Sequence, residues 1–186
     1  IVNKSQEMLN DIEKAEQLKK DIDDINIPGI EKPTDNDSEK LNDALNKIND
    51  LLDDKNQDTP TSSLTEEQKK QLEDLRSDIE NKQNIIKQVK NSIIIIEQGD
   101  DKESGVFYIN NKPSITIDDQ AELETVLDKI DNLLKNSEAN LTQNQKAKLE
   151  NYHEQMLAKL KDAAKQDIEN ELAKTKKQIE SSIIDQ

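Results

Sequence analysis

Residues 41–52 read LNDALNKINDLL, and residues 123–134 read LETVLDKIDNLL. Six of the twelve positions are identical at an offset of 82 residues, and every apolar position of one stretch is apolar in the other. The apolar residues recur at steps of one, three and four, so in a helix of about 3.6 residues per turn they share one face. Each stretch therefore predicts a short amphipathic helix, and the two together predict an internal duplication.

A second pair of matching stretches follows the first. Residues 64–73 read LTEEQKKQLE and residues 141–150 read LTQNQKAKLE, with six of ten positions identical at an offset of 77 residues. The spacing of Thr65 from Gln68, and of Thr142 from Gln145, is that of a capping box, which predicts a helix start at each place. Ser38, and Asp119 with Glu122, are the predicted caps of the two short helices.

Each capping box opens a long helix. Residues 64–98 carry an apolar seam with a heptad spacing, in which only Lys82 interrupts the companion row. Its members are Leu72, Leu75, Ile79, Ile86, Val89, Ile93 and Ile96. The second long helix is predicted from about residue 142 to residue 184, with apolar positions at steps of three and four. These are Leu149, Tyr152, Met156, Leu160, Ala164, Ile168, Leu172, Thr175, Ile179 and Ile183.

The N-terminal segment carries a comparable apolar stripe and ends in a loop that contains Pro28 and Pro33. The stripe consists of Met8, Ile12, Ala15, Leu18, Ile22 and Ile25. The pattern predicts an all-α chain of elongated tandem three-helix bundles, in which neighbouring bundles share the long helix at about 64–98 in a spectrin-like way. We assign residues 1–80 to a first bundle repeat and residues 81–186 to a second. Because the chain opens at Ile1 without a Met, we expect it to be an internal fragment.

Residues 105–117 depart from the helical pattern. They read GVFYINNKPSITI, alternate in polarity and are rich in β-branched residues, which predicts a small β-hairpin turning at Asn110-Asn111. Phe107 and Tyr108 would then lie on opposite faces of the hairpin. They are the candidate protein-binding residues of the chain, because exposed aromatic side chains form binding hot spots. The alternative is that one ring closes the end of the helical seam while the other lies on the surface.

The composition limits the functions that this chain can have. It is 31% hydrophobic and 36% charged, with a net charge of −15, three glycines and no cysteine. Low hydrophobicity and high charge also fit a disordered chain, but the duplicated helical spacing favours a folded one. The negative charge disfavours binding to nucleic acid or to an anionic membrane. No apolar run is long enough for membrane insertion.

No combination of residues predicts a catalytic, cofactor or metal site. The single histidine, His153, falls beside the seam and has no second histidine or cysteine with which to bind a metal ion. The stretch from Asp100 to Gly105 resembles a calcium loop, but Lys102 and Asn111 stand where that loop needs oxygen ligands and a bidentate Glu. Three scattered glycines cannot form a phosphate-binding loop. We therefore expect no enzymatic activity and no cofactor.

The two pairs of matching stretches, and their tandem spacing, resemble the helical-bundle repeats of large cell-wall-anchored surface proteins of low-GC Gram-positive bacteria. That resemblance implies an extracellular location on the bacterial surface, adjacent repeats of the same parent chain, and a role as a stalk or as an adhesive repeat. An adhesive repeat would present a helix face to a host protein such as albumin, immunoglobulin or a matrix protein. The alternative is an intracellular coiled-coil scaffold or a segment of a secreted effector.

Overall fold

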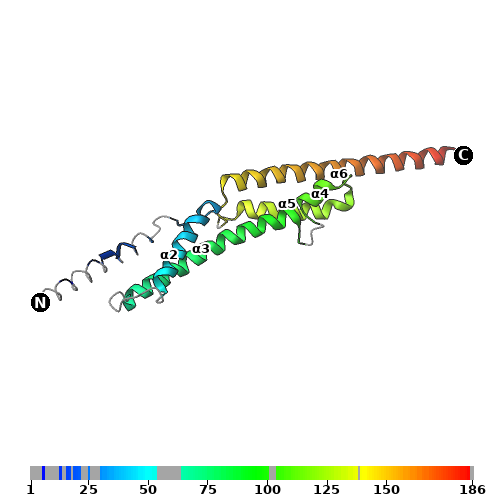
Figure 1. Ribbon diagram of the computed structural model, residues 1–186. Coiled ribbons are helices and arrows are strands. Elements are labelled where there is room, and N and C mark those ends of the chain that lie inside the picture. The colour runs from blue at the N-terminus through cyan, green and yellow to red at the C-terminus, as the bar shows by residue number, and fades with distance from the viewer. Residues whose placement is uncertain are drawn as a thin grey trace. The chain divides into compact units, whose positions relative to one another are not determined.

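The computed structural model describes residues 30–53, 64–100, 104–137 and 139–184, together with eight residues before residue 30. In this part of the chain every regular element is a helix, so the all-α prediction is confirmed (Figure 1). The elements are η1 (Asp35–Asp37), α2 (Ser38–Leu52), α3 (Glu66–Gln98), α4 (Val106–Asn111), η3 (Ile117–Asp119), α5 (Gln120–Lys135) and α6 (Gln143–Ile184). None of these helices combines the length and the apolar content that crossing a membrane requires.

The chain forms two compact units, Ile1–Lys87 and Gln88–Gln186. The buried core of the first unit consists of Ile25, Leu41, Ala44, Ile48, Leu64, Leu72, Ile79 and Ile86. The core of the second consists of Val89, Ile93, Ile96, Val106, Ile109, Leu123, Val126, Ile130, Leu133, Leu149, Tyr152 and Met156. The helix α3 is continuous and contributes to both cores. Of the predicted N-terminal stripe only Ile25 belongs to the residues whose side chains are described as buried.

The duplication seen in the sequence has a structural counterpart at the start of the short helices. In the first unit Thr34 precedes η1, and the Asp37 carboxylate accepts hydrogen bonds from its backbone N–H, at 2.8 Å, and from its hydroxyl. Thr116 and Asp119 form the same pair before α5, also with an N–H bond of 2.8 Å. The backbone angles of the two threonines agree within one degree. Each short helix is therefore entered by the same capped turn.

The starts of the long helices are duplicated as well. Thr65 and Gln68 exchange two hydrogen bonds of 2.9 and 3.2 Å, and Thr142 and Gln145 exchange two of the same lengths. Both predicted capping boxes are therefore confirmed. The predicted cap at Ser38 is wrong by one residue, because Asp37 is the N-cap of α2 and Ser38 is its first residue.

The predicted β-hairpin at 105–117 is wrong, because Val106–Asn111 forms the short helix α4. The turn before it depends on two glycines. Gly99 ends α3 with a φ of 76°, a left-handed conformation that favours glycine, and its N–H donates to the Ile95 carbonyl at 2.8 Å. A Cβ on Gly105 would lie 2.4 Å from the Gly99 nitrogen, so the two backbones approach each other too closely for any larger residue.

Helical geometry also explains which residues of α4 are buried. Val106 and Ile109 are three residues apart and share the inward face, where both are fully buried. A strand would have placed residues 106 and 109 on opposite faces. The alternating appearance of the sequence therefore concealed a short helix whose two buried apolar residues belong to the second core.

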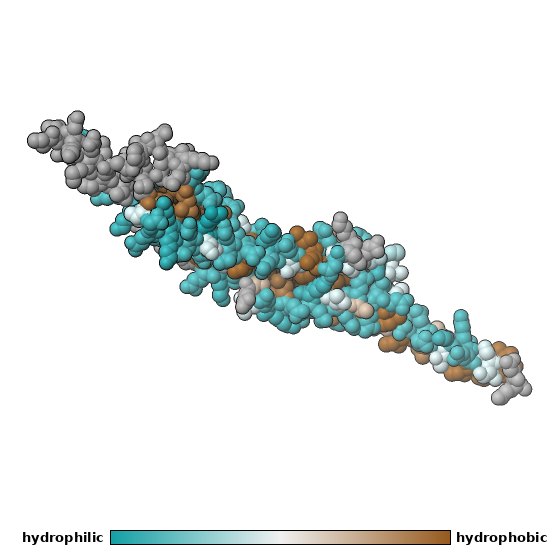
Figure 2. All heavy atoms as spheres, turned by 90° about the horizontal axis from the view of Figure 1, so that it is seen from below, coloured by the Kyte–Doolittle hydropathy of each residue, from teal (hydrophilic) through white to brown (hydrophobic). Residues whose placement is uncertain are grey.

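The surface of the chain is mainly polar, as the composition requires. The face in Figure 2 is mostly hydrophilic, but hydrophobic side chains recur along the C-terminal end of α6. In α6 the last buried residue is Ala163, and every described residue from 168 to 184 is exposed.

Candidate functional site

The two candidate binding residues lie next to each other on the outer side of α4. Phe107 is 45% exposed and Tyr108 is 38% exposed. Because consecutive residues of a helix differ by about 100°, both residues lie outside the fully buried face that Val106 and Ile109 form. They do not lie on opposite faces, as the hairpin prediction required.

The Phe107 ring is supported by α6. It packs edge-on against the Tyr152 ring, with 6.3 Å between the ring centroids and 88° between the ring planes. This is a favoured geometry for two aromatic rings. The Tyr152 hydroxyl donates a hydrogen bond of 2.8 Å to the buried Glu97 of α3, and the same carboxylate oxygen lies 2.6 Å from the Lys148 ammonium. Burial, with help from the Glu97 hydrogen bond, raises the pKa of Tyr152 to about 12.

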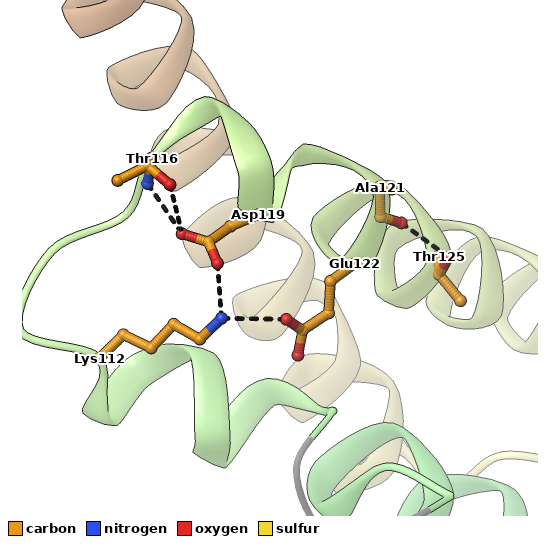
Figure 3. Close-up of polar contacts among 6 residues, drawn as sticks. All are labelled: Lys112, Thr116, Asp119, Ala121, Glu122 and Thr125. Carbon is orange, nitrogen blue, oxygen red and sulfur yellow. Dashed lines mark hydrogen bonds and ion pairs between the residues drawn. The ribbon is translucent and has the colours of Figure 1, made fainter.

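Tyr108 is held by Lys112, whose ammonium lies 4.7 Å from the centre of the Tyr108 ring. At this distance a cation and an aromatic face attract each other. The same ammonium lies 2.5 Å from the Asp119 carboxylate and 3.1 Å from Glu122 (Figure 3). Lys112 follows α4, Asp119 ends η3, and Glu122 belongs to the first turn of α5. One cation therefore ties α4 to the start of α5.

The charges of this cluster are largely shielded from solvent, since the side chains of Lys112 and Asp119 are only 18% and 16% exposed. The hydrogen bond from Lys112, followed by that from the Thr116 N–H, holds the pKa of Asp119 below its usual value. In turn the Asp119 carboxylate raises the pKa of Lys112, although burial opposes it. Both shifts favour the charged pair. Glu122 Oε1 is buried and has no hydrogen-bond partner in the described part of the chain, so Glu122 depends on Lys112.

A side-chain hydrogen bond completes the attachment of α4. Asn110 Nδ2 donates to Gln155 Oε1 of α6 at 2.9 Å. The exposed surface formed by Phe107, Tyr108, Asn110 and Lys112 is called the α4 face below. It is a preorganised surface with two aromatic rings in fixed positions, which can contact another protein.

Sequence reasoning identified the two aromatic residues but missed the groups that hold them. Asp119 was expected to pair with Glu122 in a capping box, but the structure places Lys112 between the two carboxylates. Lys112 lay in the supposed hairpin, so its proximity to a helix start was not apparent. Glu97 immediately follows the Ile93–Ile96 run, and nothing in its local sequence suggests burial.

His153 lies at the edge of the α6 seam, where the sequence places it. Its side chain is 34% exposed, and Nε2 lies 3.3 Å from the Asp131 carboxylate. A hydrogen bond from Lys135 is the main cause that lowers the pKa of Asp131.

In the described residues no three acidic or histidine side chains are grouped so that they could hold a metal ion. A surface depression between α3 and α5 is lined in part by Ile95 and Lys129.

Comparison with known proteins adds no assignment. No family model, no curated protein and no solved structure matches this chain.

Proposed function

We propose that this chain is a non-enzymatic spacer segment of a bacterial surface protein, built from tandem three-helix bundles that share the long helix α3. One observation carries the proposal. The capped turn that opens each short helix and the capping box that opens each long helix occur twice with the same geometry. Two copies of one folding unit in series are the basis of repeat proteins, in which each unit mainly contacts its neighbours.

Equivalent core residues support the same interpretation. In α2 and α5 the residues Leu41, Ala44 and Ile48 correspond to Leu123, Val126 and Ile130, and all six are buried. In the long helices Leu72 and Ile79 correspond to Leu149 and Met156, which are also buried. In the proposed arrangement the end of α3, with the buried Val89, Ile93 and Ile96, would be the third helix of the second bundle.

A spacer needs length, solubility and resistance to bending more than it needs a binding cleft. The helix α3, which contributes residues to both cores and has no break in its backbone, supports this role. The 33 residues of α3 span about 50 Å at 1.5 Å per residue. The high net charge keeps a long polar surface soluble.

Small-angle X-ray scattering of the chain tests the tandem arrangement. A compact domain of this length has a radius of gyration of about 16 Å. The proposal expects a value of about 30 Å and a maximum dimension of about 80–120 Å, as for stacked helical units. A compact scattering profile would refute the spacer function.

The surface location needs a separate experiment. An antiserum raised against the chain should label intact cells of the source organism, and protease added outside the cells should remove the signal. Labelling only after lysis would favour the alternative, an intracellular coiled-coil scaffold. Recovery of the parent protein in the culture medium would favour a secreted effector.

A second function, adhesion, is favoured by the α4 face. Two adjacent aromatic side chains on a fixed helix are typical of binding hot spots. The host proteins to be tested are albumin, immunoglobulin and matrix proteins. Binding that is lost in a Phe107→Ser/Tyr108→Ser variant, but kept in Ile184→Ser, would assign adhesion to this face. Equal behaviour of the two variants would leave the chain as a plain spacer.

A further inference from the structure

The apolar surface of α6 changes sides along the helix. Its buried residues Leu149, Tyr152 and Met156 face the second core. From Met156 to Leu172 one row of apolar residues advances in steps of four, through Leu160, Ala164 and Ile168, while the buried Ala163 stays on the side of Met156. Each such step moves about 40° around a helix of 3.6 residues per turn. After four steps, Leu172 lies about 160° from Met156, on the opposite side of α6.

The result is a second apolar stripe that the second core does not use. We call it the α6 stripe, and it consists of Ala164, Ile168, Leu172, Thr175, Ile179 and Ile183. Its four large apolar residues are 57–70% exposed. Exposed apolar rows of this length on a helix are typical of association surfaces.

The spacing of the α6 stripe is the same in both directions. Its steps are four, four, three, four and four residues. An identical helix laid antiparallel against it therefore meets a stripe residue at every level. Ile168 lies opposite Ile179 of the second copy, Leu172 opposite Thr175, and Ala164 opposite Ile183. The central four residues have the alternating three and four spacing of a coiled-coil seam.

The charged residues along one flank of the stripe follow the same two-fold symmetry. In the antiparallel pair each of them comes close to a residue of opposite charge in the second copy. Lys165, Glu169, Lys176 and Glu180 are all exposed and follow one flank of the stripe. In the antiparallel alignment Glu169 approaches Lys176 of the second copy, and Lys165 approaches Glu180. Each pair occurs twice because of the symmetry. On the other flank Glu171 approaches the neutral Gln178, so no like charges oppose each other.

We propose that the α6 stripe binds a second copy of this chain as an antiparallel two-helix seam centred between Leu172 and Thr175. The palindromic apolar spacing sets the register, and the flanking charges set the direction. The seam lies on the side of α6 that faces away from the second core, so association requires no unfolding. The dimer goes beyond the spacer function, because it would join two parent chains side by side.

Charge reversal tests the proposal in the full chain. Sedimentation equilibrium of the unaltered chain, at low salt and over increasing concentration, should show a monomer–dimer equilibrium. Lys176→Glu places a second carboxylate against Glu169 at both symmetric positions, and the dissociation constant should rise about tenfold, as two exposed pairs that turn repulsive would give. The double variant Glu169→Lys/Lys176→Glu recreates both attractions and should restore dimerisation. Lys177→Glu, on the outer face of α6, makes the same charge change and should have little effect.

The rescue also separates this arrangement from a parallel one. A parallel seam would oppose Lys176 to Glu171, so the added Glu169→Lys change would not restore it. Circular dichroism should give the same helix content for the unaltered chain and its three variants, which excludes unfolding as the cause.

Cross-linking tests the register, since the chain has no natural cysteine. In the proposed seam a cysteine at 175 lies about 5 Å along the axis from its counterpart, whereas cysteines at 183 lie about 28 Å apart. A short bismaleimide should therefore link Thr175→Cys rapidly and Ile183→Cys slowly. A chain that stays monomeric at every concentration, a dimer indifferent to the charge variants, or faster linking at 183 would overturn the proposal. If the chain stays monomeric, the α6 stripe would instead pack against a further repeat of the parent chain.

Discussion

The hydroxyl of Tyr152 donates a hydrogen bond of 2.8 Å to the Glu97 carboxylate, and this bond joins α6 to the end of α3 within the second unit. Glu97 is the one charged residue among the buried side chains of the described chain. A buried carboxylate is costly unless it is paired. Lys148 provides the opposite charge, and Tyr152 provides a neutral donor from inside the core.

Replacement of Tyr152 by Phe should lower the free energy of unfolding by about 1–2 kcal/mol, because Glu97 loses a buried donor while the ring contact with Phe107 remains. Urea denaturation followed by circular dichroism measures the change. Tyr108→Phe removes an exposed hydroxyl and is the matched control, with an expected effect within about 0.5 kcal/mol. Equal effects of the two variants would show that the Glu97 bond contributes nothing.

The ionisation of Tyr152 gives an independent measurement. Tyr108→Phe leaves Tyr152 as the only tyrosine of the chain. Its pKa is raised to about 12, chiefly by burial, so its absorbance change should occur about two pH units above that of an ordinary tyrosine. Because the folded-state pKa of Tyr152 is raised, its contribution to the free energy of unfolding is complete below about pH 10. This contribution is lost as the pH rises towards 12. A normal titration in the folded chain would contradict the buried Tyr152.

Lys112 and Lys135 each lie 2.5 Å from a carboxylate, but their surroundings differ. The side chains of Lys112 and Asp119 are only 18% and 16% exposed, whereas the Lys135 side chain is 74% exposed. Lys112→Met should therefore destabilise the second unit by about 1–3 kcal/mol, because the carboxylates of Asp119 and Glu122 lose their shared cation. Lys135→Met should cost less than about 0.5 kcal/mol. Thermal denaturation compares them, and similar losses would refute the proposed role of Lys112 at the α4–α5 junction.

Asp37 and Asp119 provide a matched pair for a pH experiment. Both have a lowered pKa, but the main cause for Asp37 is the Thr34 N–H and for Asp119 is Lys112. A lowered folded-state pKa stabilises the chain above the unfolded value of 3.8, and this stability is lost as the pH falls through the folded value. Carboxylate titration by NMR should show that Lys112→Met raises the pKa of Asp119 and leaves that of Asp37 unchanged. A shift at both residues, or at neither, would contradict the assignment.

The two capping boxes predict two local and similar effects. Thr65→Ala should expose the first amides of α3, and Thr142→Ala those of α6, each at a cost of about 1 kcal/mol. Hydrogen exchange followed by mass spectrometry should show faster exchange only at the start of the affected helix. Thr125→Ala, whose hydroxyl bonds to the Ala121 carbonyl within α5, is a control without a cap. Faster exchange spread over the whole chain would indicate global rather than local unfolding.

The sequence by itself determined the two short helices, the two long helices and both capping boxes. All of these are local features: an apolar period of about 3.6 residues, and a Thr three residues before a Gln, need only neighbouring residues to act. The duplication could be predicted for the same reason, since it repeats these local signals. The sequence also identified Phe107 and Tyr108 as unusual.

Only the tertiary structure decided how residues 105–117 fold. A short stretch that alternates in polarity satisfies the pattern of a strand and of a single helical turn equally well. The helix prevails because the close approach of Gly99 and Gly105 brings Val106 and Ile109 onto the second core, where both are fully buried. The Lys112 cluster and the Glu97–Tyr152 bond were equally inaccessible, because they join residues 7 to 55 positions apart and depend on where separate helices meet.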